Sequence, residues 1–267
     1  MPPSTPDRSD ELPGDTAFQE AVERAAADPD VVGAILVGSR AIGPPFVRDG
    51  SDWDLRLVVR DEALDAADAR HATPHGSIVE VALIRLGAFE SMADPDSPAA
   101  WDRPSYLHAV LVEDRLEGGI RMRLDALAGL EPEAARRLAA TALDGYVNSY
   151  HRSRKNAIVG LTAESHLDAA ESVAPLLTFL FAVHGRVRPF NRHLGFDLRT
   201  EPLGDGWLAA DALLPRLDEL VASGSPASQA ALFCDVEALA RAHGHGHVID
   251  SWEPDVPSLR GGAAPLD

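Results

Sequence analysis

Residues 38–55 read GSRAIGPPFVRDGSDWDL, and they follow the apolar run VVGAILV at residues 31–37. The apolar run is partly β-branched and bounded by glycine, which predicts a buried strand. After Gly38-Ser39 the chain passes through a loop with two prolines and two glycines, and a second strand is predicted at residues 53–59. This stretch therefore predicts two strands joined by a tight turn and a loop.

Asp52 and Asp54 are carboxylates at positions i and i+2 where the second strand begins. Residues with this spacing lie on the same face of a sheet. Like charges this close resist joint ionisation unless a cation shares the site. Carboxylate oxygens suit Mg²⁺, which usually completes its shell with water and substrate phosphates. Since Gly38-Ser39 offers backbone N–H groups and a hydroxyl to a phosphate, we expect a site for a metal-bound nucleoside triphosphate.

The composition is that of an ordinary globular protein. The 267 residues are 45% hydrophobic and 25% charged, which allows one large domain or two modest ones. No apolar stretch approaches the roughly 20 residues that a membrane helix needs, and residues 1–14 carry no secretion signal. The single cysteine, Cys234, excludes an internal disulfide, so we expect a cytoplasmic protein. The apolar neighbours of Cys234 predict a buried packing role.

The formal net charge of −18 limits the possible partners. It argues against nucleic acid, because affinity for nucleic acid depends on Lys and Arg that neutralise phosphates. It is compatible with a cationic small molecule that is steered by the field of the protein. The alternative is that the negative net charge reflects an acidic composition of the whole source proteome and no particular partner. Lys155 is the only lysine in the sequence.

The order of the predicted elements indicates two domains. Further strands are predicted at residues 77–84 and 109–112, and helices at 16–28 and 119–127. Beyond residue 130 the apolar residues recur with the spacing of a helix, at residues 132–154, 165–184, 208–222 and 227–243. This order predicts an α+β (or α/β) fold, with a mixed β-sheet domain and flanking helices at 15–130 and a helical bundle domain at 131–251. Residues 1–14 are predicted to be disordered and 252–267 irregular.

A third carboxylate, Glu80, is the only charge in the apolar segment SIVEVALI. The order GS, spacer, SDWDL and a carboxylate in the next strand resembles the nucleotidyltransferase superfamily of DNA polymerase β-like fold, over roughly residues 30–130. The matching positions are Gly38, Ser39, Asp52, Asp54 and Glu80. The family usually has Asp at the third position, and Glu there is similar to the streptomycin/spectinomycin adenylyltransferases. The resemblance implies Mg²⁺ as cofactor and ATP, or another nucleoside triphosphate, as donor.

The resemblance also implies roles for the carboxylates. Asp52 and Asp54 would hold Mg²⁺ against the triphosphate. Glu80 would either ligate metal or take the proton from the attacking hydroxyl, and its length mildly favours the second role. In kanamycin-type enzymes a glutamate of the helical domain is the base, which makes Glu171 a rival. The two candidates stay open at this point.

Several cations are candidates for binding the phosphates. Arg40 directly follows Ser39, and an arginine offers a planar fork to a phosphate. Arg152 and Lys155 share a polar helix face, and in antibiotic nucleotidyltransferases such a residue of the helical domain contacts the triphosphate. The alternative is a solvated face that balances nearby acids. An acidic stripe that includes Asp168 and Glu171 is expected either to pair with Arg152 or Lys155, or to accept a cationic substrate.

The leading hypothesis is a Mg²⁺-dependent nucleotidyltransferase that moves a nucleoside monophosphate, by preference AMP, to a hydroxyl of a small polar molecule. An aminoglycoside-like antibiotic or another cationic acceptor fits the acidity. One alternative is a nucleotidyltransferase toxin or regulator that modifies tRNA or a protein. A second alternative is a non-catalytic nucleotide-binding module.

Overall fold

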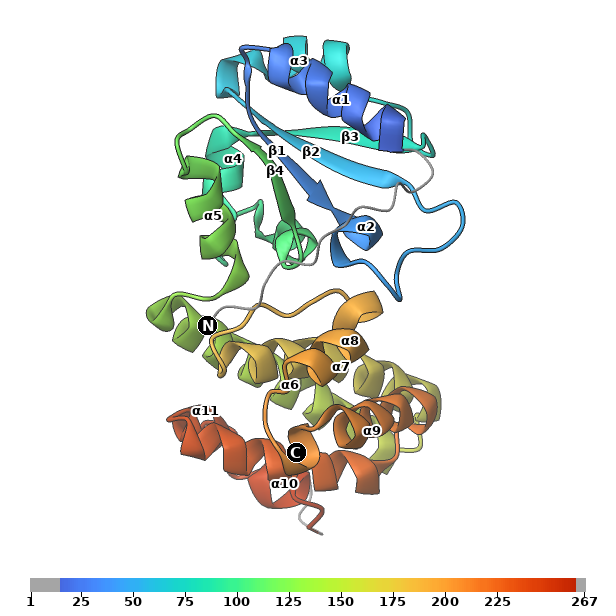
Figure 1. Ribbon diagram of the computed structural model, residues 1–267. Coiled ribbons are helices and arrows are strands. Elements are labelled where there is room, and N and C mark those ends of the chain that lie inside the picture. Colours follow the sequence, from blue (N-terminus) through green and yellow to red (C-terminus); the bar gives the residue numbers. More distant parts are fainter. Residues whose placement is uncertain (1–14, 263–267) are drawn as a thin grey trace. The chain divides into compact units, whose positions relative to one another are not determined.

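The computed structural model describes residues 15–262 of the chain. The chain divides between Leu127 and Ala128 into two compact units. The first contains the sheet and the second consists of helices (Figure 1). The predicted tail at 1–14, and the last part of the tail predicted at 252–267, lie outside the described residues.

The first unit is built on a mixed four-stranded sheet. Its strands are β1 (Val31–Val37), β2 (Trp53–Val59), β3 (Val79–Arg85) and β4 (Val110–Asp114). They lie in the order β3-β2-β1-β4. β1 pairs antiparallel with β2 and β4, whereas β2 and β3 are parallel. The predicted mixed sheet is confirmed.

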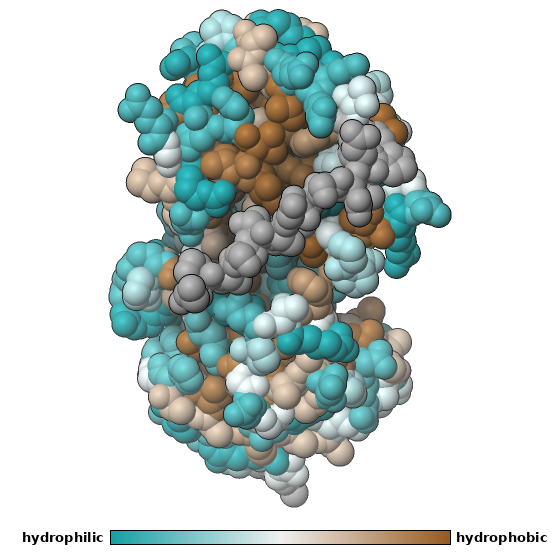
Figure 2. All heavy atoms as spheres, viewed as in Figure 1, coloured by the Kyte–Doolittle hydropathy of each residue, from teal (hydrophilic) through white to brown (hydrophobic). Residues whose placement is uncertain are grey.

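Helices flank both faces of this sheet. They are α1 (Asp15–Ala27), α2 (Gly38–Ile42), α3 (Leu64–His71), α4 (Leu86–Ser91) and α5 (Gly119–Ala128), with 3₁₀ turns at Asp61–Ala63 and Ala100–Tyr106. Because side chains alternate along a strand, Leu55 and Leu57 of β2 pack on the face that α1 and α3 cover, and Val58 packs toward Phe89 and Ile120 on the other face. Figure 2 shows hydrophobic residues gathered over the sheet on the visible face of this unit.

The second unit is helical, which confirms the other half of the predicted fold. Its helices are α6 (Pro132–Ile158), α7 (Thr162–Ala182), α8 (Asn191–Thr200), α9 (Ala210–Ser223), α10 (Pro226–Ala242), α11 (Gly246–Asp250) and α12 (Val256–Leu259), with a 3₁₀ turn at Gly206–Leu208. The core contains buried aromatic side chains from α6, α7 and α10, namely Tyr146, Tyr150, Phe179, Phe181 and Phe233. Such rings dominate the energetics of a core of this size.

Two predictions for the helical unit are wrong. The tail predicted to be irregular contains α12, where the Tyr150 hydroxyl donates a 2.7 Å hydrogen bond to the carbonyl oxygen of Leu259. Cys234 is exposed. Its neighbours Leu232 and Phe233 are buried, but on a helix only one stripe faces the core, and Cys234 lies outside it. Across residues 15–262, no helix combines the length and the apolar character needed to cross a bilayer.

Candidate functional site

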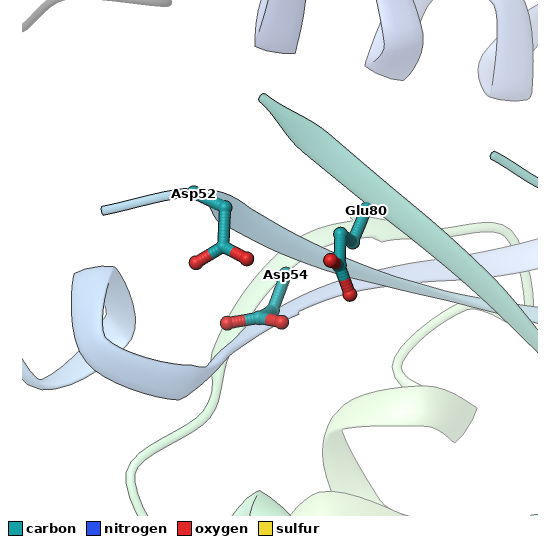
Figure 3. A group of neighbouring side chains, drawn as sticks. All are labelled: Asp52, Asp54 and Glu80. Carbon is teal, nitrogen blue, oxygen red and sulfur yellow. The ribbon is translucent and has the colours of Figure 1, made fainter. Parts of the chain in front are cut away.

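Three carboxylates meet on one face of the sheet. Asp52 lies just before β2, Asp54 lies within β2, and Glu80 is on β3. The parallel register pairs Asp54 with Glu80, so both side chains point to the same face. One oxygen of each of the three residues lies within 4.8 Å of the others, and Figure 3 shows the carboxylates turned toward one another. The structure therefore brings together three residues that the sequence places in two separate segments.

This donor set fits a divalent cation. All three side chains are partly buried, and in the described part of the chain no other group of three acidic, histidine or cysteine side chains is disposed in this way. Three anions at this separation repel one another, and a cation between them offsets that repulsion. Oxygen ligands alone favour Mg²⁺ over the metals that prefer nitrogen or sulfur.

Glu80 has two further partners that the sequence did not predict. The backbone N–H of Gly76 donates to Oε1 of Glu80, and Nδ1 of His75 lies 2.7 Å from the same oxygen. The hydrogen bonds from Gly76 and His75 lower the pKa of Glu80. In return the carboxylate raises the pKa of His75. The signal in the sequence was the turn PHG at residues 74–76, which ends four residues before Glu80.

The Gly38-Ser39 turn lies at the end of β1, beside Asp54. The φ angle of Gly38 is +73°, a conformation that glycine adopts without strain. Val37 is the register partner of Asp54, so the turn follows directly on the residue paired with the second carboxylate. Ser39 is largely buried in the first turn of α2. The turn that the sequence predicts to bind phosphate thus lies next to the predicted metal ligands.

Arg40 is directed at the protein backbone. Its Nε donates to the carbonyl oxygens of Ser51 (3.0 Å) and Asp52 (3.1 Å), and its Nη2 donates to that of Ser51 (2.7 Å). Its guanidinium carbon also lies 4.4 Å from the centre of the Trp53 ring. Only 6% of the residue is exposed. These partners differ from the phosphate that the sequence predicts for Arg40.

The remaining candidates belong to the helical unit. Arg152 and Lys155 lie on α6, and Glu171 lies on α7. Nη2 of Arg152 contacts Oε2 of Glu171 at 2.5 Å and Oδ1 of Asp168 at 3.1 Å. Of the two roles expected for the acidic stripe, pairing with Arg152 is therefore present in the structure.

Comparison with known proteins adds a distant likeness at the level of the fold. No protein-family model matches the sequence, and no curated protein matches it either. Among solved structures, the chain is similar to a nucleotidyltransferase-like protein from Exiguobacterium sibiricum, with 12% sequence identity and a TM-score of 0.42. The alignment covers 88% of this chain and 89% of that one. This similarity is too low to assign a function, so the candidate site stands on its own geometry.

Proposed function

We propose that this chain is a metal-dependent nucleotidyltransferase. It would transfer a nucleoside monophosphate, by preference AMP from ATP, to a hydroxyl of a small polar acceptor and release pyrophosphate. The observation that carries the proposal is the meeting of Asp52, Asp54 and Glu80 on one sheet face, beside the turn at Gly38-Ser39. Carboxylates that gather next to a glycine turn at the start of a helix match the needs of phosphoryl-type transfer, where positioning and charge stabilisation do most of the catalysis.

Each residue has a role in this proposal. Asp52, Asp54 and Glu80 would hold Mg²⁺, which neutralises negative charge on the phosphates and on the departing pyrophosphate when it is bound. The backbone N–H groups of Gly38 and Ser39, with the Ser39 hydroxyl, would orient a phosphate. Lys155 and Arg152 are proposed as donor-binding cations on the strength of the sequence pattern alone.

The lowered pKa of Glu80 supports one of its two expected roles. A general base works best when its pKa lies near the working pH, and a carboxylate of lowered pKa is a poorer proton acceptor. The same carboxylate remains a good ligand because it stays ionised. We therefore place Glu80 with the metal ligands and keep Glu171 as the candidate base.

The class of acceptor is proposed from the net charge of the protein. A protein with a net charge of −18 attracts cationic molecules over long range, which supports an aminoglycoside-like or other cationic acceptor that carries a hydroxyl. The same field disfavours tRNA as acceptor, since tRNA binding needs a positive surface.

The proposal is tested in two steps. Thermal unfolding is followed with ATP, GTP, CTP or UTP, with and without Mg²⁺, for the wild type and for Asp54→Asn. We expect ATP to stabilise only the wild type, and only with Mg²⁺, because a ligand of the native state raises the unfolding temperature. Pyrophosphate release is then measured with a panel of small hydroxyl acceptors. If no nucleotide stabilises the wild type with Mg²⁺ present, the proposal fails.

A further inference from the structure

Arg40 connects two parts of the candidate site that are separated by a loop. It lies on α2, next to Ser39 and one residue further from the turn at Gly38. Its guanidinium reaches across the loop and donates three hydrogen bonds to the carbonyl oxygens of Ser51 and Asp52. One side chain therefore holds the backbone from which the first proposed metal ligand projects.

The same guanidinium also fixes the residue between the two aspartates. Its carbon lies 4.4 Å from the centre of the Trp53 ring, and the Phe18 ring stacks on Trp53 with 4.3 Å between centroids. Arg40 and Phe18 therefore both pack against the Trp53 ring. Stacking of this kind is favourable for arginine and for aromatic pairs. Trp53 is thereby held by one side chain of α1 and one of α2.

These contacts leave Arg40 badly suited to bind a substrate phosphate. The residue is buried, with only 6% of its surface exposed to solvent. Its Nε and Nη2 already donate to the backbone, and turning the fork to a phosphate would break those bonds. The geometry instead suits a residue that acts on the site through its neighbours.

We propose that Arg40 is a positioning residue that sets the distance between the Gly38-Ser39 turn and the ligand Asp52. The role rests on the proposed function, because it takes the three carboxylates as a metal site. Ser39 and Arg40 are consecutive on one helix, so the hydrogen bonds to Ser51 and Asp52 hold the phosphate-binding turn and the metal ligand in one rigid piece. Groups that orient a metal ligand from outside typically change metal affinity by about 10- to 100-fold when they are lost.

The test uses Mn²⁺ alone as the probe, without nucleotide. Binding is measured by the electron paramagnetic resonance signal of free Mn²⁺ for the wild type, Arg40→Lys and Arg40→Met. Arg48→Met is the matched control, because Arg48 is an exposed arginine on the loop that Arg40 spans. We expect Arg40→Met to bind Mn²⁺ about tenfold or more weakly. Arg40→Lys should be intermediate, since an ammonium cannot reproduce the planar fork, and Arg48→Met should match the wild type.

A purely structural role predicts a different result. It would lower the unfolding temperature of the Arg40 variants and leave the Mn²⁺ affinity of the folded protein unchanged, which would overturn the proposal. If Arg40→Met does not fold, Arg40→Lys decides by the same criterion. In an Asp52→Asn background the effect of Arg40→Lys on Mn²⁺ affinity should shrink, because it acts through Asp52. A full effect in that background also overturns the proposal.

The two proposals fail in distinguishable ways. If the wild type binds no Mn²⁺, the metal-dependent function is lost and the positioning role with it. If the wild type binds Mn²⁺ and the Arg40 variants bind it equally well, only the positioning role is lost.

Discussion

Gly38 lies so close to Asp54 that a side chain on the glycine would overlap with the Oδ2 atom of the aspartate. The φ angle of Gly38 is +73°, which residues with a Cβ adopt only at a cost. The turn and the carboxylate therefore fit together only because position 38 has no side chain. In the proposed site, this contact places the phosphate-binding backbone directly against a metal ligand.

Gly38→Ala is expected to displace the Asp54 carboxylate and to weaken Mn²⁺ binding about tenfold or more. It should also lower stability by about 1–2 kcal/mol or more, from the positive φ angle and the overlap. Urea unfolding and Mn²⁺ titration check the two effects. Gly50→Ala is the control, because its φ angle is +81° but a Cβ there would meet nothing within 4 Å. Equal Mn²⁺ affinity in the two variants would contradict the expected displacement.

Glu80→Gln and Glu171→Gln are expected to behave differently. Glu80→Gln removes a proposed ligand and should abolish most Mn²⁺ binding. Glu171→Gln loses an exposed ion pair with Arg152, so it should cost under about 1 kcal/mol and leave Mn²⁺ binding unchanged. Calorimetry with Mn²⁺ and with ATP, alongside pyrophosphate release, separates the roles. Loss of turnover with retained ATP binding in Glu171→Gln identifies the base, and full turnover in that variant eliminates it.

Asp28 is expected to make the first unit sensitive to acid. Burial raises the pKa of Asp28, but the backbone N–H of Asp30 and the side chains of Arg70 and His71 outweigh it and lower the pKa to about 2. A group with a depressed pKa stabilises the fold above its unfolded pKa of about 3.9, and that contribution is lost as the pH falls toward 2. It amounts to at most about 3 kcal/mol, because a shift of one pKa unit corresponds to about 1.4 kcal/mol.

Asp28→Asn tests this contribution. The variant should be less stable than the wild type near neutral pH, and the difference should vanish between about pH 4 and pH 2. Unfolding followed by tryptophan fluorescence across that interval measures the difference. If the difference in stability between the wild type and Asp28→Asn stays constant down to pH 2, the Asp28 carboxylate is not the titrating group.

Tyr150→Phe is expected to loosen the carboxyl-terminal segment. It removes the hydroxyl that donates to the carbonyl oxygen of Leu259 and leaves that buried acceptor without this donor. Losing one partner of a buried hydrogen bond costs about 1–3 kcal/mol. Urea unfolding gives the cost, and limited proteolysis shows whether cleavage increases near α12. An unchanged midpoint and cleavage pattern would mean that α12 is held by other contacts.

The strands were predictable because each has a clear hydrophobic signal. β1 and β2 have the predicted bounds, since the apolar run of β1 stops at Gly38 and that of β2 stops at Arg60. α2 was not predicted because five residues, GSRAI, are too few to show a helical period. α8 was missed because NRHLGFDLRT is mostly polar and shows only Leu194 and Leu198 as a buried pair with helical spacing.

The members of the candidate site were predictable where the residue type itself indicates the chemistry, as it does for carboxylates. The order of Asp52, Asp54 and Glu80 predicted that the three would share a site, and the parallel register brings them together. The contacts of Arg40 could not be predicted, because its partners are backbone carbonyls, which every residue carries. His75 was missed because its role depends on a turn that folds back onto Glu80.

The loop after α2 is fastened at its far end by Arg40, through the carbonyl oxygens of Ser51 and Asp52. Between α2 and these anchors, Arg48 is exposed and its φ angle is not positive. Loop tips of this kind tolerate insertions when both ends are held. A cysteine introduced at position 48 and carrying a fluorophore, in a variant whose exposed Cys234 is replaced, would therefore serve as an optical reporter of ligand arrival, attached on the loop that leads to the carboxylates.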